Sequence, residues 1–568
     1  MSTVPQESVS QTTGELFSAK GFDGFLARAF MTAEGFSPEA VGQRPVIGIA
    51  NSWSELTPCN AGLRELAAAV KRGVIAAGGF PLEFPTISLS EPYIRPSSLY
   101  LRNLMAMDVE EMITSSPIDG VVMLGGCDKT VPAQLMGAYS ADRPSLTIAA
   151  GPRALGRWGD RELTTDDIWS LSDDHRAGLL SDEDWSCVET CLNDSVGTCN
   201  VMGTATTMAI VAEALGMALP GSALLPATSA RRRAAAEKTG RQIVERARAG
   251  LTPSQVVTRE AIWNAIRVTA ACGGSTNALL HLAALAGRVG EPLDTGELRE
   301  CLRGVPLITD VRPAGDYHLS DLDAVGGAPA VIAELGDLFD TTQLAGTDRP
   351  WSEIIVRRAP VRTSGAIRSS VSSARTAGLA VVAGTLAPDG AVVKCAGADE
   401  RLLSHCGPAV VFDGVEDLHD RIDDPNLEVT ADSVLVLRGV GPVGGPGMPE
   451  VGAIPIPKTL VQSGVRDMVR ISDARMSGTS SGTMILHACP EAAVGGPLAL
   501  VRDGDAVELD VHAGRLDLLV DEHELEARRA RLSQAKAPSR GFERLHHEHV
   551  LQASEGCDFD FLRSGARV

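Results

Sequence analysis

The N-terminal part of the chain alternates short apolar runs with amphipathic stretches, and this rhythm restricts the fold more than any other feature. Predicted strands are "RPVIGIANS" (44–52), "FPTISLS" (84–90) and "DGVVMLGG" (119–126). Predicted helices occupy residues 61–79 and 98–116, between those strands. Because strand–helix–strand units join parallel strands, we predict an α/β fold with a mainly parallel sheet covered by helices.

The sequence pattern changes near residue 380. Short β-rich runs such as "LAVVAGTLA", "PAVVFDG" and "SVLVLRGVG" follow one another with turn residues between them. The Ser-, Gly- and Arg-rich segment 359–378 reads as a connector, and a charged helix is predicted after Asp521. Since 568 residues are too many for one core, we predict an α/β domain over 1–380 and a smaller β-rich domain over 381–568.

The charge and the apolar pattern exclude several classes of function. The chain has 51 Lys+Arg against 72 Asp+Glu, a formal charge of −21, which argues against nucleic acid or an anionic membrane as a partner. The start lacks a secretory pattern, and the apolar stretch from Met208 is broken by Glu213 and Pro220, which indicates a buried helix and loop. We expect a cytoplasmic enzyme whose anionic substrate meets a local cation or metal.

Polar loops follow each of the three predicted strands. They are "NSWSELTPCN", "LSEPYIRP" and "GGCDKT", and they carry Cys59, Glu91, Cys127, Asp128 and Lys129. Ligands of parallel sheets gather beyond the carboxyl ends of the strands, so these loops are predicted to converge at one edge. A thiolate prefers iron or zinc and a carboxylate prefers Mg²⁺, so adjacent Cys127 and Asp128 indicate two different metals close together.

Further cysteines are harder to interpret. The eleven cysteines are scattered through the chain, which indicates reduced thiols rather than a disulfide framework. Cys199 lies in the loop "GTCNVMGTATTM". Cys187 and Cys191 are four residues apart and share a helix face, where they could ligate a metal or pack inward, and packing is the favoured interpretation.

Two unusual loops lie in the predicted β-rich domain. "GPVGGPGMPE" ends at Glu450, and "SDARMSGTSSGT" contains Ser477 and Ser480. The serine loop resembles a nucleophile or oxyanion loop, although Ser/Gly-rich loops are mostly turns. No histidine falls inside any of these loops, which argues against a Ser-His-Asp hydrolase.

These segments together resemble the dihydroxyacid dehydratase and sugar-acid dehydratase family. The matching motifs are "PVIGIANSWSELTPCN", "GGCDKTVPA", "GTCNVMGTATTM", "GGSTNALLHL", "GPVGGPGMPE" and "SDARMSGTSSG", in the family's order from about residue 20 to 540. The resemblance implies a barrel-like C-terminal domain and a homodimer or homotetramer. It also implies an iron–sulfur cluster on Cys59, Cys127 and Cys199, with 2Fe-2S favoured over 4Fe-4S.

The same resemblance implies Mg²⁺ bound by Glu91, Asp128 and Glu450, with Lys129 carbamylated as a further oxygen ligand. The implied reaction removes water from a 2,3-dihydroxy acid to give a 2-keto-3-deoxy acid. Its general base is a serine alkoxide, matched to Ser480, with Ser477 as the second choice.

The residues around the motifs indicate the branch. "EPYIRPSSLYLRNLMAMDVEEMI" and "SDARMSG" look like the sugar-acid branch, whereas the branched-chain amino-acid branch usually has an aspartate in place of Glu91 and "DGRFSGG" in the serine loop. The 6-phosphogluconate branch fits less well. The alternatives are a dihydroxyacid dehydratase and a non-catalytic iron or redox sensor, although a sensor has no need of the magnesium ligands.

Overall fold

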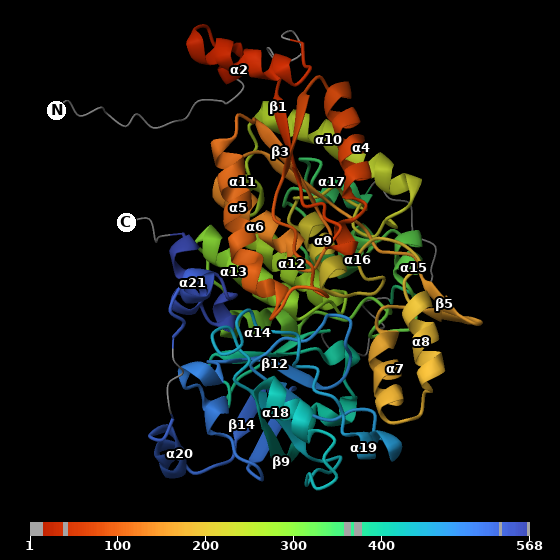
Figure 1. Cartoon of the computed structure of the whole chain (residues 1–568), viewed down its shortest axis with the longest axis vertical. Coiled ribbons are helices and arrows are strands. Elements are labelled where there is room, and N and C mark those ends of the chain that lie inside the picture. The colour runs from red at the N-terminus through yellow and green to blue at the C-terminus, as the bar shows by residue number, and fades with distance from the viewer. Residues whose placement is uncertain (1–14, 38–43, 357–364, 369–377, 533–536, 565–568) are drawn as a thin grey trace, which may run out of the picture.

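The computed structural model describes residues 15–37, 44–356, 365–368, 378–532 and 537–564 (Figure 1). The N-terminal part forms the upper, red to green region of Figure 1, and the C-terminal part forms the lower, blue-green to blue region. No helix among the described residues is long and apolar enough to cross a membrane.

A four-stranded sheet organises the N-terminal part. Its strands are β1 (Val46–Asn51), β2 (Phe80–Pro85), β3 (Gly120–Gly125) and β4 (Ser145–Ala149). They lie in the order β2-β1-β3-β4, and every neighbouring pair is parallel. The predicted parallel α/β sheet is therefore confirmed, and the loops after β1, β2 and β3 leave the sheet at the same edge.

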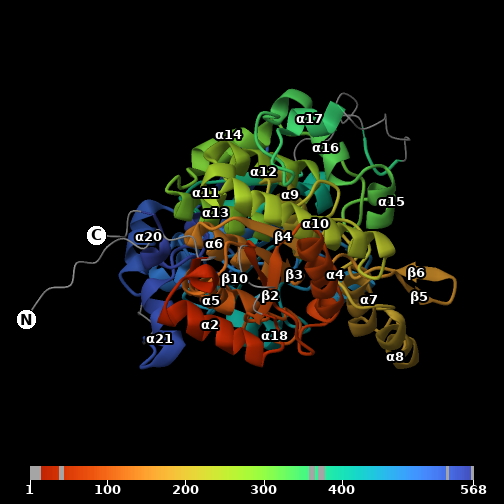
Figure 2. The same ribbon diagram turned by 90° about the horizontal axis from the view of Figure 1, so that it is seen from above.

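Both faces of this sheet are buried under helices. In β1 the side chains of Ile47 and Ile49 pack on one face with α4 (Leu63–Ala76) and α10 (Ala230–Ala249). Those of Val46 and Ala50 join the other core, which includes α5 (Arg102–Ser115) and α6 (Thr130–Ala141). Alternate residues of a strand point to opposite faces, so this division produces the three-layer α/β/α arrangement that Figure 2 shows from above.

The other helices of this part surround the same core. They are α1 (Glu15–Ser18), α2 (Phe22–Ala33), α7 (Asp167–Arg176), α8 (Asp182–Cys191), α9 (Thr204–Ala214), α11 (Pro253–Val256), α12 (Arg259–Ala271), α13 (Asn277–Val289), α14 (Thr295–Arg303), α15 (Leu319–Ala324), α16 (Ala328–Leu335) and α17 (Trp351–Val356). A small hairpin pairs β5 (Gly156–Trp158) with β6 (Arg161–Leu163). Every residue of α9 is buried, as the broken apolar stretch from Met208 predicted.

The C-terminal part contains an eight-stranded mixed sheet. Its strands are β7 (Ala380–Val382), β8 (Gly390–Val393), β9 (Ser404–Asp413), β10 (Val434–Arg438), β11 (Arg470–Ser472), β12 (Met484–Cys489), β13 (Ala506–Asp510) and β14 (Arg515–Leu518), in the order β14-β13-β9-β10-β11-β12-β8-β7. Ala383, just after β7, bridges to Arg515 of β14 and joins the two edges of the sheet. The predicted barrel-like, β-rich domain is thus confirmed.

The described residues of the C-terminal part also form four short α-helices. They are α18 (Gly414–Arg421), α19 (Lys458–Gln462), α20 (Glu522–Arg529) and α21 (Gly541–His549). The charged helix predicted after Asp521 is α20, while α21 returns to the N-terminal part, where Phe542 packs edge-on against Tyr100.

Two local expectations need correction or stay open. The strand predicted over 84–90 runs instead over Phe80–Pro85. The Thr86 amide still donates to the Asn51 carbonyl of β1 at 3.2 Å, but the Ile87 amide donates to the Asp108 carboxylate at 2.8 Å, so the pairing with β1 ends there. Most of the predicted connector 359–378 lies outside the described residues, and the division at residue 380 stays a prediction.

Candidate active site

Three loops at one edge of the parallel sheet bring the N-terminal candidates together. Cys59 lies in a short 3₁₀ turn (Pro58–Asn60) after β1, and Glu91 lies in the loop after β2. Cys127, Asp128 and Lys129 connect β3 to α6. Asn60 ties two of these loops together, since its Oδ1 accepts from the Cys127 amide at 3.2 Å. The convergence predicted from the sequence is present.

The three cysteines of the predicted cluster site line one cavity of about 1090 Å³. A hydrogen bond between the Cys59 and Cys127 side chains lowers the pKa of Cys59 and raises the pKa of Cys127. Desolvation raises the pKa of Cys199 to about 12. Arg153 Nη2 lies 3.8 Å from Cys59 Sγ and supplies a cation beside the thiols. This wall can therefore present several sulfur ligands to one soft metal centre.

By contrast, the favoured inward packing of the Cys187 and Cys191 pair is found for Cys191 alone, which packs against a small apolar cluster of Leu163, Leu171, Val188 and Leu192. Cys187 is exposed and Cys191 is half-buried on α8. Neither side chain lines the cavity that Cys199 lines.

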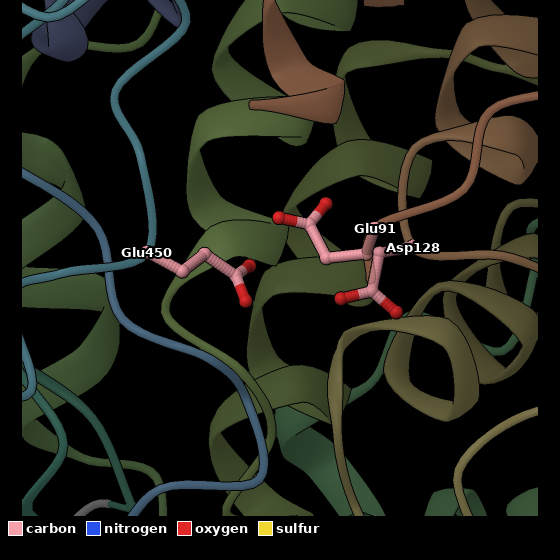
Figure 3. A group of neighbouring side chains, drawn as sticks. All are labelled: Glu91, Asp128 and Glu450. Carbon is pink, nitrogen blue, oxygen red and sulfur yellow. The ribbon is translucent and has the colours of Figure 1, made fainter. Parts of the chain in front are cut away.

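Three carboxylates form the second wall of the cavity. Glu91, Asp128 and Glu450 each offer an oxygen, and these oxygens lie within 4.8 Å of one another. Figure 3 shows Glu91 and Asp128 entering from the N-terminal loops and Glu450 entering from the opposite side on the C-terminal loop. Three converging carboxylate oxygens are a donor set suited to a hard divalent cation.

Lys129 lies beneath these carboxylates and is fully buried. Its Nζ is 3.0 Å from Glu91 Oε2, 3.1 Å from Glu450 Oε1 and 3.6 Å from Asp128 Oδ2. Burial opposes the charge, but the surrounding carboxylates outweigh it and raise the pKa of Lys129. The amine thus neutralises part of the negative charge that would otherwise be buried here.

A ring of further side chains, not assigned from the sequence, fixes the carboxylates. Arg475 Nη1 donates to Glu450 Oε1 at 2.7 Å, and Asn277 Nδ2 donates to the same oxygen at 3.0 Å. Ser98 donates to Glu91 Oε2. Arg475 and Asn277 stand inside "SDARMSG" and "GGSTNALLHL", so the motifs themselves were the signal for their importance.

These neighbours shift the pKa values of the two glutamates in opposite directions. Burial opposes ionisation of Glu91, yet the Lys129 and Arg475 cations lower its pKa to about 2. Burial and the nearby Glu91 carboxylate raise the pKa of Glu450 to about 7. Glu91 is therefore the more readily ionised of the two, and a bound cation would favour the ionised form of Glu450 as well.

The serine loop between β11 and β12 closes the cavity from the C-terminal side. Ser477 lines the cavity and is half-buried. Ser480 is 2% exposed and does not line the cavity, and its Oγ has no hydrogen-bond partner among the described residues. Lys394, also fully buried, donates from Nζ to the carbonyl oxygens of Gly478 at 3.0 Å and Ser480 at 3.5 Å. The structure therefore brings the second-choice serine, not the first, to the cavity wall.

Thiols, carboxylates and a serine hydroxyl thus face one space. A hard cation on the carboxylates can hold an acid substrate by its oxygens, and a soft metal on the thiols can take a leaving oxygen. The Ser477 hydroxyl is placed to exchange a proton with a molecule bound between them.

Comparison with known proteins identifies the family of the chain. The N-terminal model of the family described as dihydroxy-acid/6-phosphogluconate dehydratase matches residues 44–354, and the C-terminal model matches residues 367–557.

Similar proteins cover almost the whole chain. A protein of Rhizobium meliloti (strain 1021) described as putative dehydratase IlvD1 is 49% identical over 96% of both chains. The L-arabonate dehydratase of Azospirillum brasilense is 45% identical over 96% of both chains. The 6-deoxy-6-sulfo-D-gluconate dehydratase of Pseudomonas putida is 44% identical over 98% of this chain and 97% of its own.

Proposed function

Because the chain belongs to the dihydroxy-acid/6-phosphogluconate dehydratase family, and is therefore a dehydratase, we propose that it removes water from a sugar acid to give a 2-keto-3-deoxy acid. The observation that carries this proposal is the single cavity onto which the thiol wall, the carboxylate wall and Ser477 all open. The similarity to dehydratases of L-arabonate and of a sulfogluconate supports an aldonate as the substrate class.

The donor sets fit the two metal groups that such a reaction needs. Cys59, Cys127 and Cys199 would hold an iron–sulfur cluster and leave one of its positions without a protein thiolate. Three cysteines fit a 2Fe-2S or a 4Fe-4S cluster, and the resemblance to sugar-acid dehydratases favours 2Fe-2S. Glu91, Asp128 and Glu450 would hold Mg²⁺. When bound, the two groups supply Lewis-acid stabilisation of the negative charge that develops on the substrate and on the departing hydroxide.

Carbamylation of Lys129 fits the same arrangement. As an amine, its Nζ sits 3.0 to 3.6 Å from the three carboxylates and carries a positive charge at the place where a cation would bind. A carbamate on Nζ would change this group from a cation to an anionic oxygen ligand, which removes the repulsion toward Mg²⁺.

The protein side chains then have separate tasks. Arg475 and Asn277 hold the Glu450 carboxylate in place, and Ser98 holds Glu91, so the magnesium ligands are oriented before substrate arrives. Ser477, in its alkoxide form, acts as the general base and takes the proton from C2, while the hydroxyl on C3 departs as hydroxide. The proton then passes from Ser477 to the hydroxide, which leaves as water and restores the alkoxide. The resulting enol tautomerises to the 2-keto-3-deoxy acid.

The structure's placement of the two serines supports Ser477 as the base. Its side chain lines the cavity, whereas the side chain of Ser480 is buried and does not line the cavity. A base must come within hydrogen-bond distance of the proton that it removes, so exposure to the cavity is the first requirement.

The test compares two variants that differ only in which serine is removed. With anaerobically purified protein, iron and Mg²⁺, Ser477→Ala is expected to lose roughly 100- to 10,000-fold in kcat on aldonates. Ser480→Ala is expected to retain most of the rate, and both variants are expected to keep the visible absorption of the cluster. The opposite order of the two losses would assign the base to Ser480.

A further inference from the structure

We propose that Thr479, oriented by Trp169, is a positioning residue that holds the Ser477 oxygen ready to act as the base. This inference rests on the proposed function, since it takes Ser477 as the proton acceptor. It adds a hydrogen-bond chain that begins on a helix of the N-terminal part and ends at the serine.

The hydrogen bonds from Trp169 to Thr479 and from Thr479 to Ser477 are all present in the structure. Trp169 Nε1 lies 2.8 Å from Thr479 Oγ1, and Thr479 Oγ1 lies 2.8 Å from Ser477 Oγ. The backbone amide of Thr479 also donates to Ser477 Oγ, at 3.3 Å. Both the side chain and the backbone amide of Thr479 therefore form a hydrogen bond with the Ser477 hydroxyl.

The chemistry of the three side chains decides which group donates and which accepts in each of these hydrogen bonds. An indole N–H can only donate, so Trp169 occupies a lone pair of Thr479 Oγ1. A threonine hydroxyl has one proton, and with the indole as donor that proton is free to point at Ser477 Oγ. Ser477 then accepts two hydrogen bonds, and its own proton is left to face the cavity.

Two donors aimed at one serine oxygen have a clear consequence for a base. Donors that point at an oxygen favour its anionic form, as in an oxyanion hole, because they need no reorganisation when the charge appears. Thr479 is 5% exposed, so these hydrogen bonds are largely shielded from water and are stronger for that reason. The arrangement stabilises the Ser477 alkoxide that removes the C2 proton.

The position of Trp169 is fixed from the C-terminal side. Trp169 lies in α7, and Arg176 at the end of this helix pairs with Asp423 at 2.5 Å. Asp174 of the same helix pairs with Arg466 at 2.8 Å. Helix α7 is thus held against the domain that carries the serine loop, and the indole reaches Thr479 across the junction.

The test uses substitutions that separate the hydroxyl of Thr479 from its shape. Thr479→Val keeps the volume and loses the hydroxyl, and it is expected to lower kcat on an aldonate roughly 10- to 100-fold with little change in KM. Thr479→Ser keeps the hydroxyl and loses a methyl group, and it is expected to retain most of the wild-type kcat. Iron content and visible absorption are expected to match wild type in both variants.

Trp169 is tested in a double-mutant cycle. Trp169→Phe is expected to lower kcat by less than Thr479→Val, and the double variant is expected to lose no more than Thr479→Val alone, because both changes remove the same donor to Ser477. Trp185→Phe is the matched control, since Trp185 stacks on His175 and does not line the cavity.

The outcomes separate this inference from the proposed function. If Ser477→Ala abolishes turnover but Thr479→Val keeps the wild-type kcat, or if Thr479→Ser loses as much as Thr479→Val, the positioning role is overturned while the base assignment stands. Additive losses in the double variant would overturn the link between Trp169 and Thr479. If Ser477→Ala itself retains activity, the proposed base fails first and the inference fails with it.

Discussion

The parallel sheet of the N-terminal part and the closed sheet of the C-terminal part meet at one cavity but supply it with different groups. Loops at the edge of the parallel sheet provide Cys59, Cys127, Glu91 and Asp128. The polar groups that loops of the closed sheet bring to the cavity wall are Glu450 and the serine segment. The first part carries most of the groups that can hold metals, and the second part completes the metal site and adds the proton acceptor.

This division has a structural reason. Successive parallel strands bring their following loops to one edge, so ligands close in the sequence become neighbours without help from the rest of the chain. The groups of the C-terminal part arrive from far away: the bond from Lys129 to Glu450 spans 321 positions, and the bond from Arg475 to Ser97 spans 378. Mutations can therefore separate the contribution of the N-terminal metal ligands from that of the groups that the C-terminal part adds.

Removing a ligand from the N-terminal wall is the largest perturbation. Cys127→Ser is expected to lose the iron and to lower turnover by at least about 1000-fold, because the Lewis-acid stabilisation of the leaving group disappears with the cluster. Iron analysis and visible absorption of anaerobically purified protein measure the first effect. Cys187→Ser, which changes an exposed cysteine outside the cavity, is the control. Full iron and activity in Cys127→Ser would remove this residue from the ligand set.

Removing the carboxylate from the C-terminal wall is expected to act on the other metal. Glu450→Gln should keep the iron and its colour, weaken the activation by Mg²⁺ and lower turnover roughly 100-fold, because the cluster of three carboxylates loses one ligand. Titration of activity with Mg²⁺ gives the measurement, with the exposed Glu428→Gln as control. An unchanged Mg²⁺ requirement would contradict the role of Glu450, and loss of iron would break the separation of the two walls.

The serine loop can be loosened without touching either metal wall. Lys394→Met removes the donor to the carbonyl oxygens of Gly478 and Ser480 and is expected to lower kcat about 10-fold while both metals stay bound. Steady-state kinetics together with metal analysis measure the effect. The control is Lys238→Met, a change of an exposed lysine on α10. A wild-type kcat would show that Lys394 does not hold the loop in its working position.

The smallest effect is expected at the junction between the two parts. Arg176→Gln breaks the half-buried pair with Asp423 and should lower the Tm by roughly 1 to 3 °C, since such pairs contribute about 1 kcal/mol or less. Calorimetry at low and moderate salt measures it. Arg157→Gln, in an exposed pair with Glu162 at 3.4 Å, is expected to leave the Tm unchanged. Equal Tm shifts in the two variants would show that the pair at the junction stabilises the protein no more than the exposed pair does.

Much of the N-terminal site could be predicted from the sequence because it follows a local rule. A polar loop after each strand of a parallel sheet was enough to place Cys59, Glu91 and the Cys127–Lys129 segment together. Even so, the observed strand before Glu91 lies earlier than the predicted one, because at Ile87 the backbone bonds to the Asp108 side chain rather than to β1.

The C-terminal contributions could not be placed in this way. Whether Ser477 or Ser480 faces the cavity depends on the course of one turn, in which the Ser480 amide donates to the Ser477 carbonyl oxygen at 3.0 Å. The contact of Trp169 with Thr479 joins residues 310 positions apart and has no local pattern. Such contacts depend on how the two parts pack, which residue types and periodicity do not encode.

The most direct test of the central claim is the substrate profile of wild-type protein. Anaerobically purified protein with iron and Mg²⁺ is assayed for 2-keto acid formation from five- and six-carbon aldonates and from 2,3-dihydroxyisovalerate. We predict turnover of aldonates with little or none of the branched-chain precursor. A clear preference for 2,3-dihydroxyisovalerate would contradict the sugar-acid assignment, and no turnover of either class by protein with full metal content would contradict the proposed reaction.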